Sequence, residues 1–338
     1  MSDLLKGPKR VAVLGVTGLV GREIVKVLEQ RSFPVSEFIP LASEHSAGTT
    51  VEFRGESYVV TAVNDTSFCD VDLAFFSAGG SISRRWAPVA VNAGALVIDN
   101  SAAWRMDPTV PLVIPEVNPG DVKRSKGIIA NPGCSTVMSV LSLYPLHKAA
   151  GLKYVSYSTY LSVSGTGNEA VEALEAGSRA LLAGEEPPKN LVYPHPIAFD
   201  LLPHIGAFDQ DGFTEEEWKL VRESQKIMHL PDLKVSCTAV RVPVFRGHAE
   251  SIVASFGRSI SPDETKEILA GSPGVKVMDI PGDSVYPRPR YCEGKDPVYV
   301  GRIRADTGID GAIAMWVVGD NLRKGAALNT VQIAELLL

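Results

Sequence analysis

The sequence predicts an α/β protein of two domains, the first built on a parallel β-sheet and the second of the α+β class. Its 338 residues are 45% hydrophobic and 21% charged, which is enough apolar sequence for two globular cores. Short apolar β-type runs alternate with helical segments as far as Pro132, and longer β-rich runs follow it. We therefore expect a first domain of residues 1–132 and 320–338 and a second domain of residues 133–319.

The elements of the first domain follow a β-α-β order. Residues 10–15 are an apolar run that ends in glycine, and residues 21–31 carry apolar side chains at the spacing of one helical face. Such repeats imply a parallel sheet covered by helices on both faces. They continue with apolar runs at 38–42, 73–76 and 95–98 and a helical segment at 83–93.

The second domain is predicted to contain a mixed sheet with helices on one face. A last helix-like segment, residues 321–338, has an apolar face that could pack back on the first domain. The β-rich runs are residues 152–164, 235–245 and 249–256, and the helical segments between them are 168–183 and 214–228.

Charge and cysteine spacing exclude several classes of protein. The 33 Lys and Arg against 39 Asp and Glu give a net charge of -6, and no basic run exceeds a pair, so we expect no nucleic-acid partner. No apolar run reaches the about 18 residues of a bilayer span, and the first residues lack the apolar core of a signal peptide. We therefore expect a cytoplasmic protein without a membrane partner. The four cysteines form no close pair, which predicts neither a metal site nor a disulfide.

A glycine-rich turn joins the first predicted strand to the first predicted helix. Glycines three residues apart let the backbone approach a pyrophosphate at the positive N-terminus of a helix, as in Rossmann-like dinucleotide-binding domains. The alternative is a simple tight turn. The candidate cofactor-binding residues in this turn are Gly15, Thr17, Gly18, Leu19, Val20 and Gly21.

The segment after the second strand bears on the choice of cofactor. Ser43 and Ser46 could donate to the 2′-phosphate of NADP, whereas Glu44 could hold the free ribose of NAD. NADP is favoured, and NAD stays possible.

Cys134 is the candidate nucleophile. It follows an Asn-Pro-Gly turn at the start of an apolar segment with the character of a buried helix. The dipole and the unpaired amides of a helix N-terminus stabilise a thiolate, so a cysteine there is unusually nucleophilic. Cys69, Cys237 and Cys292 are expected to be buried structural cysteines instead.

A thiolate nucleophile needs an acid or base, and His248 lies in the histidine segment that best resembles a site. Arg241, seven residues earlier, would face the opposite way on one straight strand unless Gly247 introduces a bulge or turn. From this segment alone, a surface position for His248 is favoured over a catalytic one.

With these motifs in place, the chain resembles the aspartate-β-semialdehyde dehydrogenase family over nearly its whole length. The resemblance implies a Rossmann-like dinucleotide-binding domain followed by a catalytic and dimerisation domain. It also implies NADPH-dependent reductive dephosphorylation of an acyl phosphate, β-aspartyl phosphate, to aspartate semialdehyde and inorganic phosphate, a step toward lysine, methionine and threonine. A homodimer or a dimer of dimers is implied as well. Further matching stretches are residues 77–80, 99–105, 114–118, 216–219, 301–304 and 319–327.

By this resemblance, Cys134 forms a thioacyl intermediate, His248 acts as acid and base, and Arg241 binds the substrate carboxylate. Each role suits the chemistry of its side chain. Without the resemblance, Glu216 and Lys219 would be interpreted as a solvated ion pair on a helix. The further implied roles are Arg105 and Lys219 for phosphate, Glu216 for the substrate amine or the lysine, and Ser77, Gly79, Ser164, Gly165 and Asn321 for the cofactor.

Three positions depart from the family pattern. His45 stands where an arginine usually contacts the 2′-phosphate, Gly133 where an asparagine usually precedes the nucleophile, and Leu161 where a glutamine usually touches substrate. The cysteine turn is also similar to that of N-acetyl-γ-glutamyl-phosphate reductases. The alternatives are therefore a paralogue that reduces another acyl phosphate or an acyl-CoA, and a catalytically weak, cofactor-binding subunit.

Overall fold

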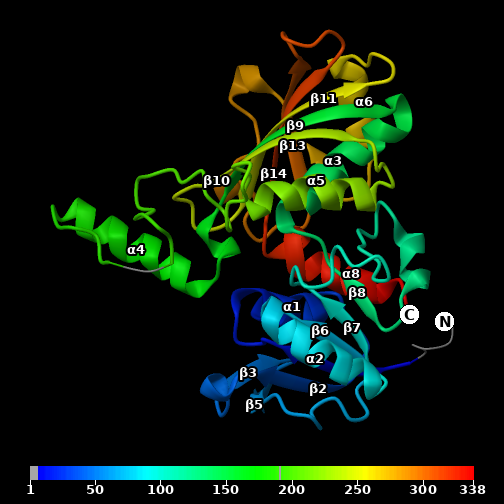
Figure 1. The fold of residues 1–338 in the computed structure, drawn as a ribbon, viewed down its shortest axis with the longest axis vertical. Helices are drawn as coiled ribbons and strands as arrows, with labels where there is room; N and C mark the ends of the chain where they lie inside the picture. The colour runs from blue at the N-terminus through cyan, green and yellow to red at the C-terminus, as the bar shows by residue number, and fades with distance from the viewer. Residues whose placement is uncertain (1–6, 190–191) are drawn as a thin grey trace. The chain divides into compact units, whose positions relative to one another are not determined.

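The computed structural model describes residues 7–189 and 192–338, and the chain divides into two compact units (Figure 1). The first unit is Met1–Gly133 with Ala326–Leu338, and the second is Cys134–Gly325. Both units combine a β-sheet with helices, which confirms the predicted α/β class. Within the described ranges, no helix has the length and apolar character to cross a membrane.

The first unit is built around a six-stranded parallel sheet in the order β5-β2-β1-β6-β7-β8. Its strands are β1 (Lys9–Leu14), β2 (Val35–Ala42), β5 (Thr61–Ala62), β6 (Leu73–Phe76), β7 (Leu96–Asp99) and β8 (Ile128–Ala130). A separate hairpin consists of β3 (Thr50–Phe53) and β4 (Glu56–Val59). The helices are α1 (Leu19–Gln30), α2 (Gly80–Asn92) and α8 (Leu328–Glu335).

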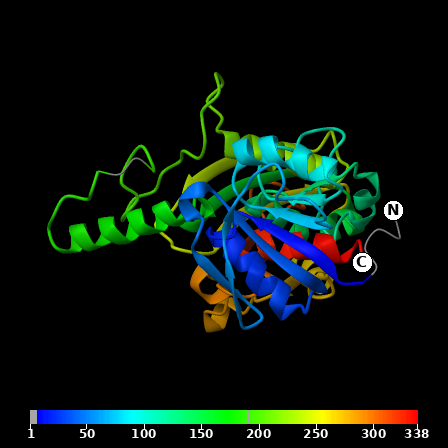
Figure 2. The ribbon, with the colours of Figure 1, turned by 90° about the horizontal axis from the view of Figure 1, so that it is seen from below.

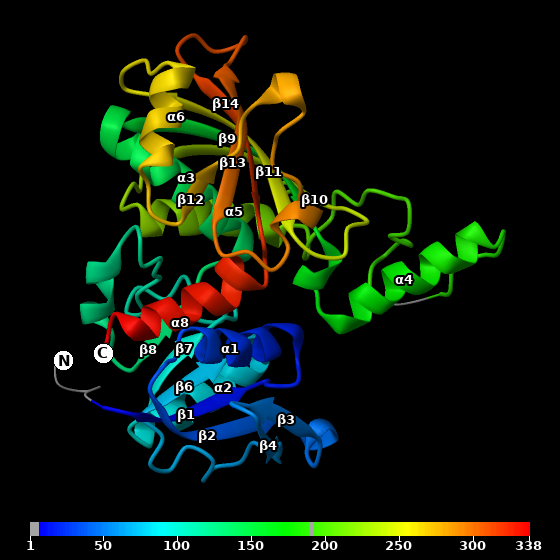
Figure 3. The same cartoon turned by 180° about the vertical axis from the view of Figure 1, so that it is seen from behind.

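Alternate residues of β1 face two different cores. Val11 and Val13 belong to a cluster that includes side chains of α1 and α8, whereas Ala12 and Leu14 pack with those of α2. Helices therefore cover both faces of the parallel sheet, as the β-α-β repeats predict, and α1 and α8 lie together on one face (Figure 3). The strand order reverses where β1 lies between β2 and β6, and ligands of such sheets bind at the carboxyl ends of the strands there.

The end of the chain completes the first unit. A continuous helix is predicted over residues 321–338, but the structure has a π-helical turn at Arg323–Ala327 before α8 begins. Apolar side chains of α8, including Leu328 and Val331, are buried in the core beside β1 and α1. The expectation that this segment packs on the first domain is confirmed.

The second unit is built around a mixed six-stranded sheet in the order β10-β9-β11-β14-β13-β12. Its strands are β9 (Leu152–Leu161), β10 (Lys234–Arg241), β11 (His248–Phe256), β12 (Val275–Val277), β13 (Val298–Ala305) and β14 (Ile313–Gly319). Its helices are α3 (Cys134–Ala150), α4 (Asn168–Leu182), α5 (Glu215–Ile227), α6 (Pro262–Ala270) and the short α7 (Pro289–Cys292).

Helices α3, α5 and α6 pack against this sheet, with α3 crossing β9, β11, β13 and β14. α4 extends away from the rest of its unit (Figure 2). The central strand β11 pairs antiparallel with both β9 and β14, while β10 runs parallel to β9. The predicted mixed sheet is confirmed, and its central strand β11 begins at His248, which contacts the first residue of α3.

Gly21 offers a test of the turn between β1 and α1. A Cβ atom at Gly21 would lie 2.1 Å from the carbonyl oxygen of Gly15, so the turn cannot close over a larger residue. We expect Gly21→Ala to lower the free energy of unfolding by about 1 to 3 kcal/mol, because overpacking forces the backbone to shift. Chemical denaturation measures this. Gly120→Ala is the matched control, since a Cβ there meets nothing within 4 Å, and equal losses would contradict the prediction.

Candidate active site

The glycine turn of the first unit exposes backbone amides at the start of a helix. Gly15 has a φ of +87°, and Gly18 is the N-cap of α1 with no side chain bonded into the cap. The amide of Gly18 donates to the carbonyl of Gly15 at 3.1 Å, which closes the turn. Because Gly18 and Gly21 carry no Cβ and the first amides of a helix lack partners inside it, the turn fits a pyrophosphate.

The other cofactor candidates of this unit meet at the same end of the sheet. The hydroxyl of Ser77, just after β6, donates to the carbonyls of Leu14 and Gly15 at 3.2 and 3.3 Å. Gly79 is the N-cap of α2, with a φ of +90°. Thr17 contacts Ser46 through their hydroxyls at 3.4 Å, which brings the segment after β2 to the glycine turn.

That segment is a 3-10 turn, Glu44–Ser46, whose N-cap is Ser43. Glu44 and His45 are both exposed. A cofactor ribose next to the glycine turn would therefore meet two serine hydroxyls, one carboxylate and one imidazole.

Cys134 and His248 form a direct contact in the second unit. Cys134 is the first residue of α3, and its Sγ lies 3.2 Å from Nε2 of His248, the first residue of β11. His248 is fully buried, so the surface position favoured from its sequence segment is wrong. A Cβ at Gly325 would lie 2.7 Å from that of Cys134, so only glycine allows the chain to pass this close to the cysteine.

The backbone of Ser162 determines which nitrogen of His248 carries the proton. Its amide donates to Nδ1 of His248 at 3.0 Å. In a neutral imidazole the proton is then on Nε2, which faces the sulfur of Cys134. Burial, and after it the positive charge of Arg241, holds the pKa of His248 well below its usual value. The ring is therefore a neutral hydrogen-bond donor to the sulfur.

Arg241 approaches His248 from a different strand. Arg241 ends β10 and His248 begins β11, and these strands flank β9 on its two sides. The segment between them turns at Gly247, which has a φ of +90°. This turn resolves the seven-residue spacing that one straight strand cannot accommodate. Nη1 of Arg241 donates to the carbonyl of Ser162 at 2.7 Å, so one peptide residue contacts both side chains.

Gly165 borders this group. A Cβ at position 165 would lie 3.2 Å from Nη1 of Arg241 and 3.3 Å from Nε2 of His248. Any larger residue would crowd the two functional groups from the side of the Val163–Gly165 turn. Glycine therefore leaves space in front of the imidazole and the guanidinium.

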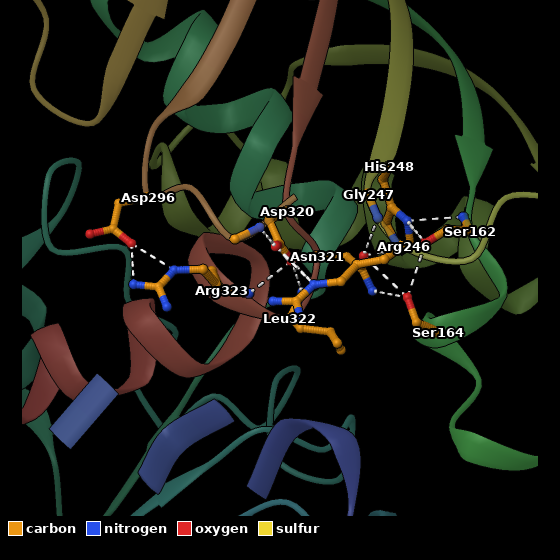
Figure 4. Close-up of polar contacts among 11 residues, drawn as sticks. Ser162, Ser164, Arg246, Gly247, His248, Asp296, Asp320, Asn321, Leu322 and Arg323 are labelled. Atoms are coloured by element: carbon orange, nitrogen blue, oxygen red, sulfur yellow. Dashed lines mark hydrogen bonds and ion pairs between the residues drawn. The ribbon is translucent and has the colours of Figure 1, made fainter. Parts of the chain in front are cut away.

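Asn321 connects the serine turn to the histidine turn (Figure 4). Its Nδ2 donates to Oγ of Ser164 at 3.0 Å, and its Oδ1 accepts from the amide of Gly247 at 2.8 Å. In these contacts Asn321 orders the residues around His248. Its expected contact with the cofactor stays a prediction.

Sequence reasoning missed Asp320, which anchors this network (Figure 4). The carboxylate is fully buried and accepts from Nε of Arg246 at 2.9 and 3.0 Å. It also accepts from the amides of Gly294 at 2.6 Å and Leu322 at 2.9 Å. Residues 319–327 match the family, but nothing in the sequence pattern shows which partners Asp320 has. Ser162 was missed because it acts through its backbone.

Glu216 is held next to the first turn of α3. The Oγ of Ser135, the residue after Cys134, donates to Oε1 of Glu216 at 2.8 Å. Nζ of Lys219 lies 3.3 Å from Oε2. Thr214 begins α5 with a capping box that fixes the register of this helix. Because Glu216 is 9% exposed, the interpretation of a solvated surface pair is wrong.

Arg105 lies in the first unit, where its guanidinium donates to two backbone carbonyls. Nε bonds the carbonyl of Asn131 at 2.9 Å, and Nη2 bonds that of Asn100 at 2.8 Å. The arginine is buried, and these two contacts hold it in one orientation. Its expected contact with phosphate stays a prediction.

The remaining cysteines only partly follow expectation. Cys237 and Cys292 are buried, and burial raises the pKa of both thiols, that of Cys292 to about 12. Cys69 is exposed, so its assignment as a buried structural residue is wrong. It lies in the turn before β6, outside the apolar run.

Comparison with known proteins identifies the family. Residues 10–125 match the semialdehyde dehydrogenase NAD binding domain, and residues 143–324 match the semialdehyde dehydrogenase dimerisation domain. The aspartate-semialdehyde dehydrogenase of Aquifex aeolicus is 54% identical over 97% of this chain and 98% of its own length. That of Bacillus subtilis is 47% identical over 97% of this chain and 96% of its own length.

Solved structures agree with these relatives. Aspartate semialdehyde dehydrogenase II of Vibrio cholerae is 42% identical, with a TM-score of 0.95 and 98% of each chain covered. A structure of that enzyme complexed with ASA also has a TM-score of 0.95, with 41% identity and 98% of each chain covered. The Candida albicans enzyme with NADP is 25% identical, with a TM-score of 0.74 over 98% of each chain. The resemblance inferred from the motifs is thus confirmed, and the chain belongs to the aspartate-semialdehyde dehydrogenase family.

Proposed function

We propose that this protein catalyses the NADPH-dependent reductive dephosphorylation of L-aspartyl 4-phosphate to L-aspartate 4-semialdehyde through a thioacyl intermediate on Cys134. One observation carries the proposal: Sγ of Cys134, at a helix N-terminus, lies 3.2 Å from a buried imidazole whose proton faces it. Family membership supplies the substrate class. The product is the semialdehyde from which lysine, methionine and threonine are made.

The first chemical step joins the sulfur to the substrate. The thiolate of Cys134 attacks the acyl carbon, a C–S bond forms, and the C–O bond to the phosphoryl group breaks as phosphate leaves with the electron pair. Before attack, Nε2–H of His248 stabilises the thiolate as a hydrogen-bond donor. The dipole of α3 adds to this stabilisation.

The second step releases the aldehyde. Hydride delivery to the thioester carbon is the chemistry that bound NADPH supplies. Nε2–H of His248 can donate to the oxyanion that develops on this carbon. When the C–S bond breaks, the electron pair returns to Sγ of Cys134, and the same N–H group again stabilises the thiolate.

Arg241 is the proposed ligand of the substrate's α-carboxylate. Within the described chain its Nε is buried without a hydrogen-bond partner, while Nη1 is held by Ser162. A buried guanidinium N–H is costly to leave unpaired, and a carboxylate satisfies it with a charge-assisted bond. Glu216 then receives the substrate's ammonium group, and Lys219 and Arg105 receive the phosphate.

NADP is the proposed cofactor. The glycine turn of the first unit would hold its pyrophosphate, and Ser43 and Ser46 would donate to its 2′-phosphate. An arginine would place a permanent positive charge beside the 2′-phosphate, which His45 does not. The carboxylate of Glu44, next to it, repels the phosphate. NAD therefore stays an expected second cofactor.

A homodimer, or a dimer of dimers, is the proposed assembly. The second unit matches a dimerisation domain. Tyr160, Ser251 and Trp316 lie on the face of its sheet opposite α3, which is the face that we propose for the interface. We propose the cytoplasm as its location, because a thiolate nucleophile needs a reducing compartment.

A second candidate function is the reduction of a less polar acyl phosphate or acyl-CoA. Leu161 favours it, because this side chain is 1% exposed at the end of β9, directly across from Arg241. A leucine there offers no hydrogen bond to a substrate. The assembled Cys134–His248 contact argues against a catalytically weak subunit.

Cys134→Ser tests the nucleophile. We expect kcat to fall roughly a thousandfold or more, because a hydroxyl is far less ionised than a thiol at neutral pH. The assay follows NADPH formation from aspartate semialdehyde and phosphate. Cys69→Ser is the control, since Cys69 is exposed and should leave kcat unchanged. An acyl adduct found on another cysteine would contradict the assignment.

The buried, neutral state of His248 predicts a pH dependence of stability. Its pKa is lowered in the folded protein, so below about pH 6.5 the unfolded chain binds a proton that the folded protein does not. We compare the unfolding free energies of the wild type and His248→Asn. As the pH falls toward about 5, the value for the wild type should drop relative to that of the variant by up to about 1.4 kcal/mol per pH unit. Urea denaturation at several pH values measures this.

His45→Asn is the matched control, because His45 is exposed. Its stability difference from the wild type should stay nearly constant over the same range. If the His248→Asn difference also stays constant, the imidazole is not held neutral.

The double variant Leu161→Gln with Gly133→Asn tests the substrate. A hydrogen bond to a charged group contributes about 1.5 to 3 kcal/mol, or roughly ten- to a hundredfold in rate if it is made in the transition state. If the native pocket is tuned to a less polar substrate, the double variant should raise kcat/KM for aspartate semialdehyde and lower it for apolar aldehydes. No gain would mean that backbone amides or water already supply these contacts.

A further inference from the structure

Glu250 is a buried carboxyl group that the proposed mechanism does not use. It lies on β11 two residues after His248, so both side chains point to the same face of the sheet, toward α3. The residue is fully buried. Its partner across the ladder on β9 is Thr159, which is also fully buried.

Glu250 and Glu216 differ in their hydrogen-bond donors. Within the described chain, neither carboxyl oxygen of Glu250 has a hydrogen-bond partner, and the hydroxyl of Thr159 has none either. Glu216, in contrast, accepts from Ser135 and is paired with Lys219. Burying an ionised carboxylate without hydrogen-bond donors costs free energy. Ionising two buried carboxyl groups near one another costs more, because the two negative charges repel.

The groups that act on Glu250 come from several elements. Burial is the main cause that raises the pKa of Glu250 well above its usual value, and the charge of Glu216 on α5 adds to it. The hydroxyl of Ser139 on α3 lies near Glu250 and acts to lower its pKa, but its proton is directed to the carbonyl of Ser135, so the oxygens of Glu250 accept no hydrogen bond from it. Tyr157 on β9 and Cys237 on β10 also face this group, and both stay neutral because their own pKa values are raised.

A chain of contacts connects Glu250 to the first turn of α3. Ser139, next to Glu250, donates to the carbonyl of Ser135 at 2.9 Å. The hydroxyl of Ser135 donates to Glu216 at 2.8 Å. Ser135 directly follows Cys134, so a shift in this chain would move the first turn of the nucleophile's helix and the carboxylate of Glu216 together.

We propose that Glu250 is a neutral carboxylic acid in the working enzyme and a positioning residue, which holds Glu216, through Ser139 and Ser135, as the anion that receives the substrate's ammonium group. The second part rests on the proposed function. The proton belongs on Glu250 because Glu216 has the donors and the cation, while a protonated Glu250 adds no second charge. Its hydroxyl can donate to Thr159 or Ser139.

An infrared difference spectrum tests the protonation without any substrate. We expect the wild type at pH 7 to show the C=O stretch of a protonated carboxylic acid that Glu250→Gln lacks. Glu217→Gln is the matched control: this buried carboxylate accepts from the amides of Thr214 and Ala239, so its removal should take away carboxylate absorption only. If Glu250→Gln loses carboxylate absorption instead, Glu250 is ionised and the proposal fails.

Steady-state kinetics test the positioning. We expect Glu250→Ala to raise KM for aspartate semialdehyde about tenfold with little change in KM for NADP. Glu250→Gln should bring it back within about threefold, because a neutral amide has the same shape and can donate to Thr159 or Ser139 as the protonated acid would. A Glu250→Gln variant as impaired as Glu250→Ala, or equal rises in both KM values, would overturn the positioning role. A different true substrate would leave the infrared result intact, so failure of the proposed function is recognised separately.

Discussion

The positions of His248 and Arg241 both depend on the backbone of Ser162, the residue that follows β9. The amide of Ser162 donates to His248 and its carbonyl accepts from Arg241, so the imidazole and the proposed carboxylate ligand are held by the same residue. Both bonds are buried, where hydrogen bonds hold geometry tightly and water does not compete. β10 and β11 flank β9, so the pairing of these strands brings Arg241 and His248 to the two sides of Ser162.

In each unit, the proposed site for an anionic group lies at a helix N-terminus. α1 begins after the glycine turn that is the proposed pyrophosphate site, and α3 begins at Cys134, the proposed nucleophile. In each case a glycine permits a close approach: Gly21 against Gly15, and Gly325 against Cys134. Both proposed sites would therefore be stabilised in the same way, by the partial positive charge and the free amides of a helix N-terminus.

Three buried acidic residues near the site have different environments and different consequences. Asp320 accepts from one guanidinium and several amides and orders the turn before His248. Glu216 accepts from Ser135 and keeps Lys219 close. Neither carboxyl oxygen of Glu250 has a hydrogen-bond partner within the described chain. The proposed proton on Glu250 follows from this difference, because an ionised carboxylate is costly to bury without hydrogen-bond donors.

The class of fold, the parallel sheet, the glycine turn and, through resemblance, the family could be predicted from the sequence, because periodicity, glycine spacing and short motifs are local properties of the chain. The proposed nucleophile, Cys134, was found from such a motif as well. Only the tertiary structure decided that His248 is buried, that Arg241 meets it from another strand, and that Ser162 orients both. These facts depend on hydrogen bonds between Ser162 and side chains 79 and 86 positions further along the chain. The environments of Asp320, Glu216 and Glu250 also arise from packing between distant elements, which no local pattern encodes.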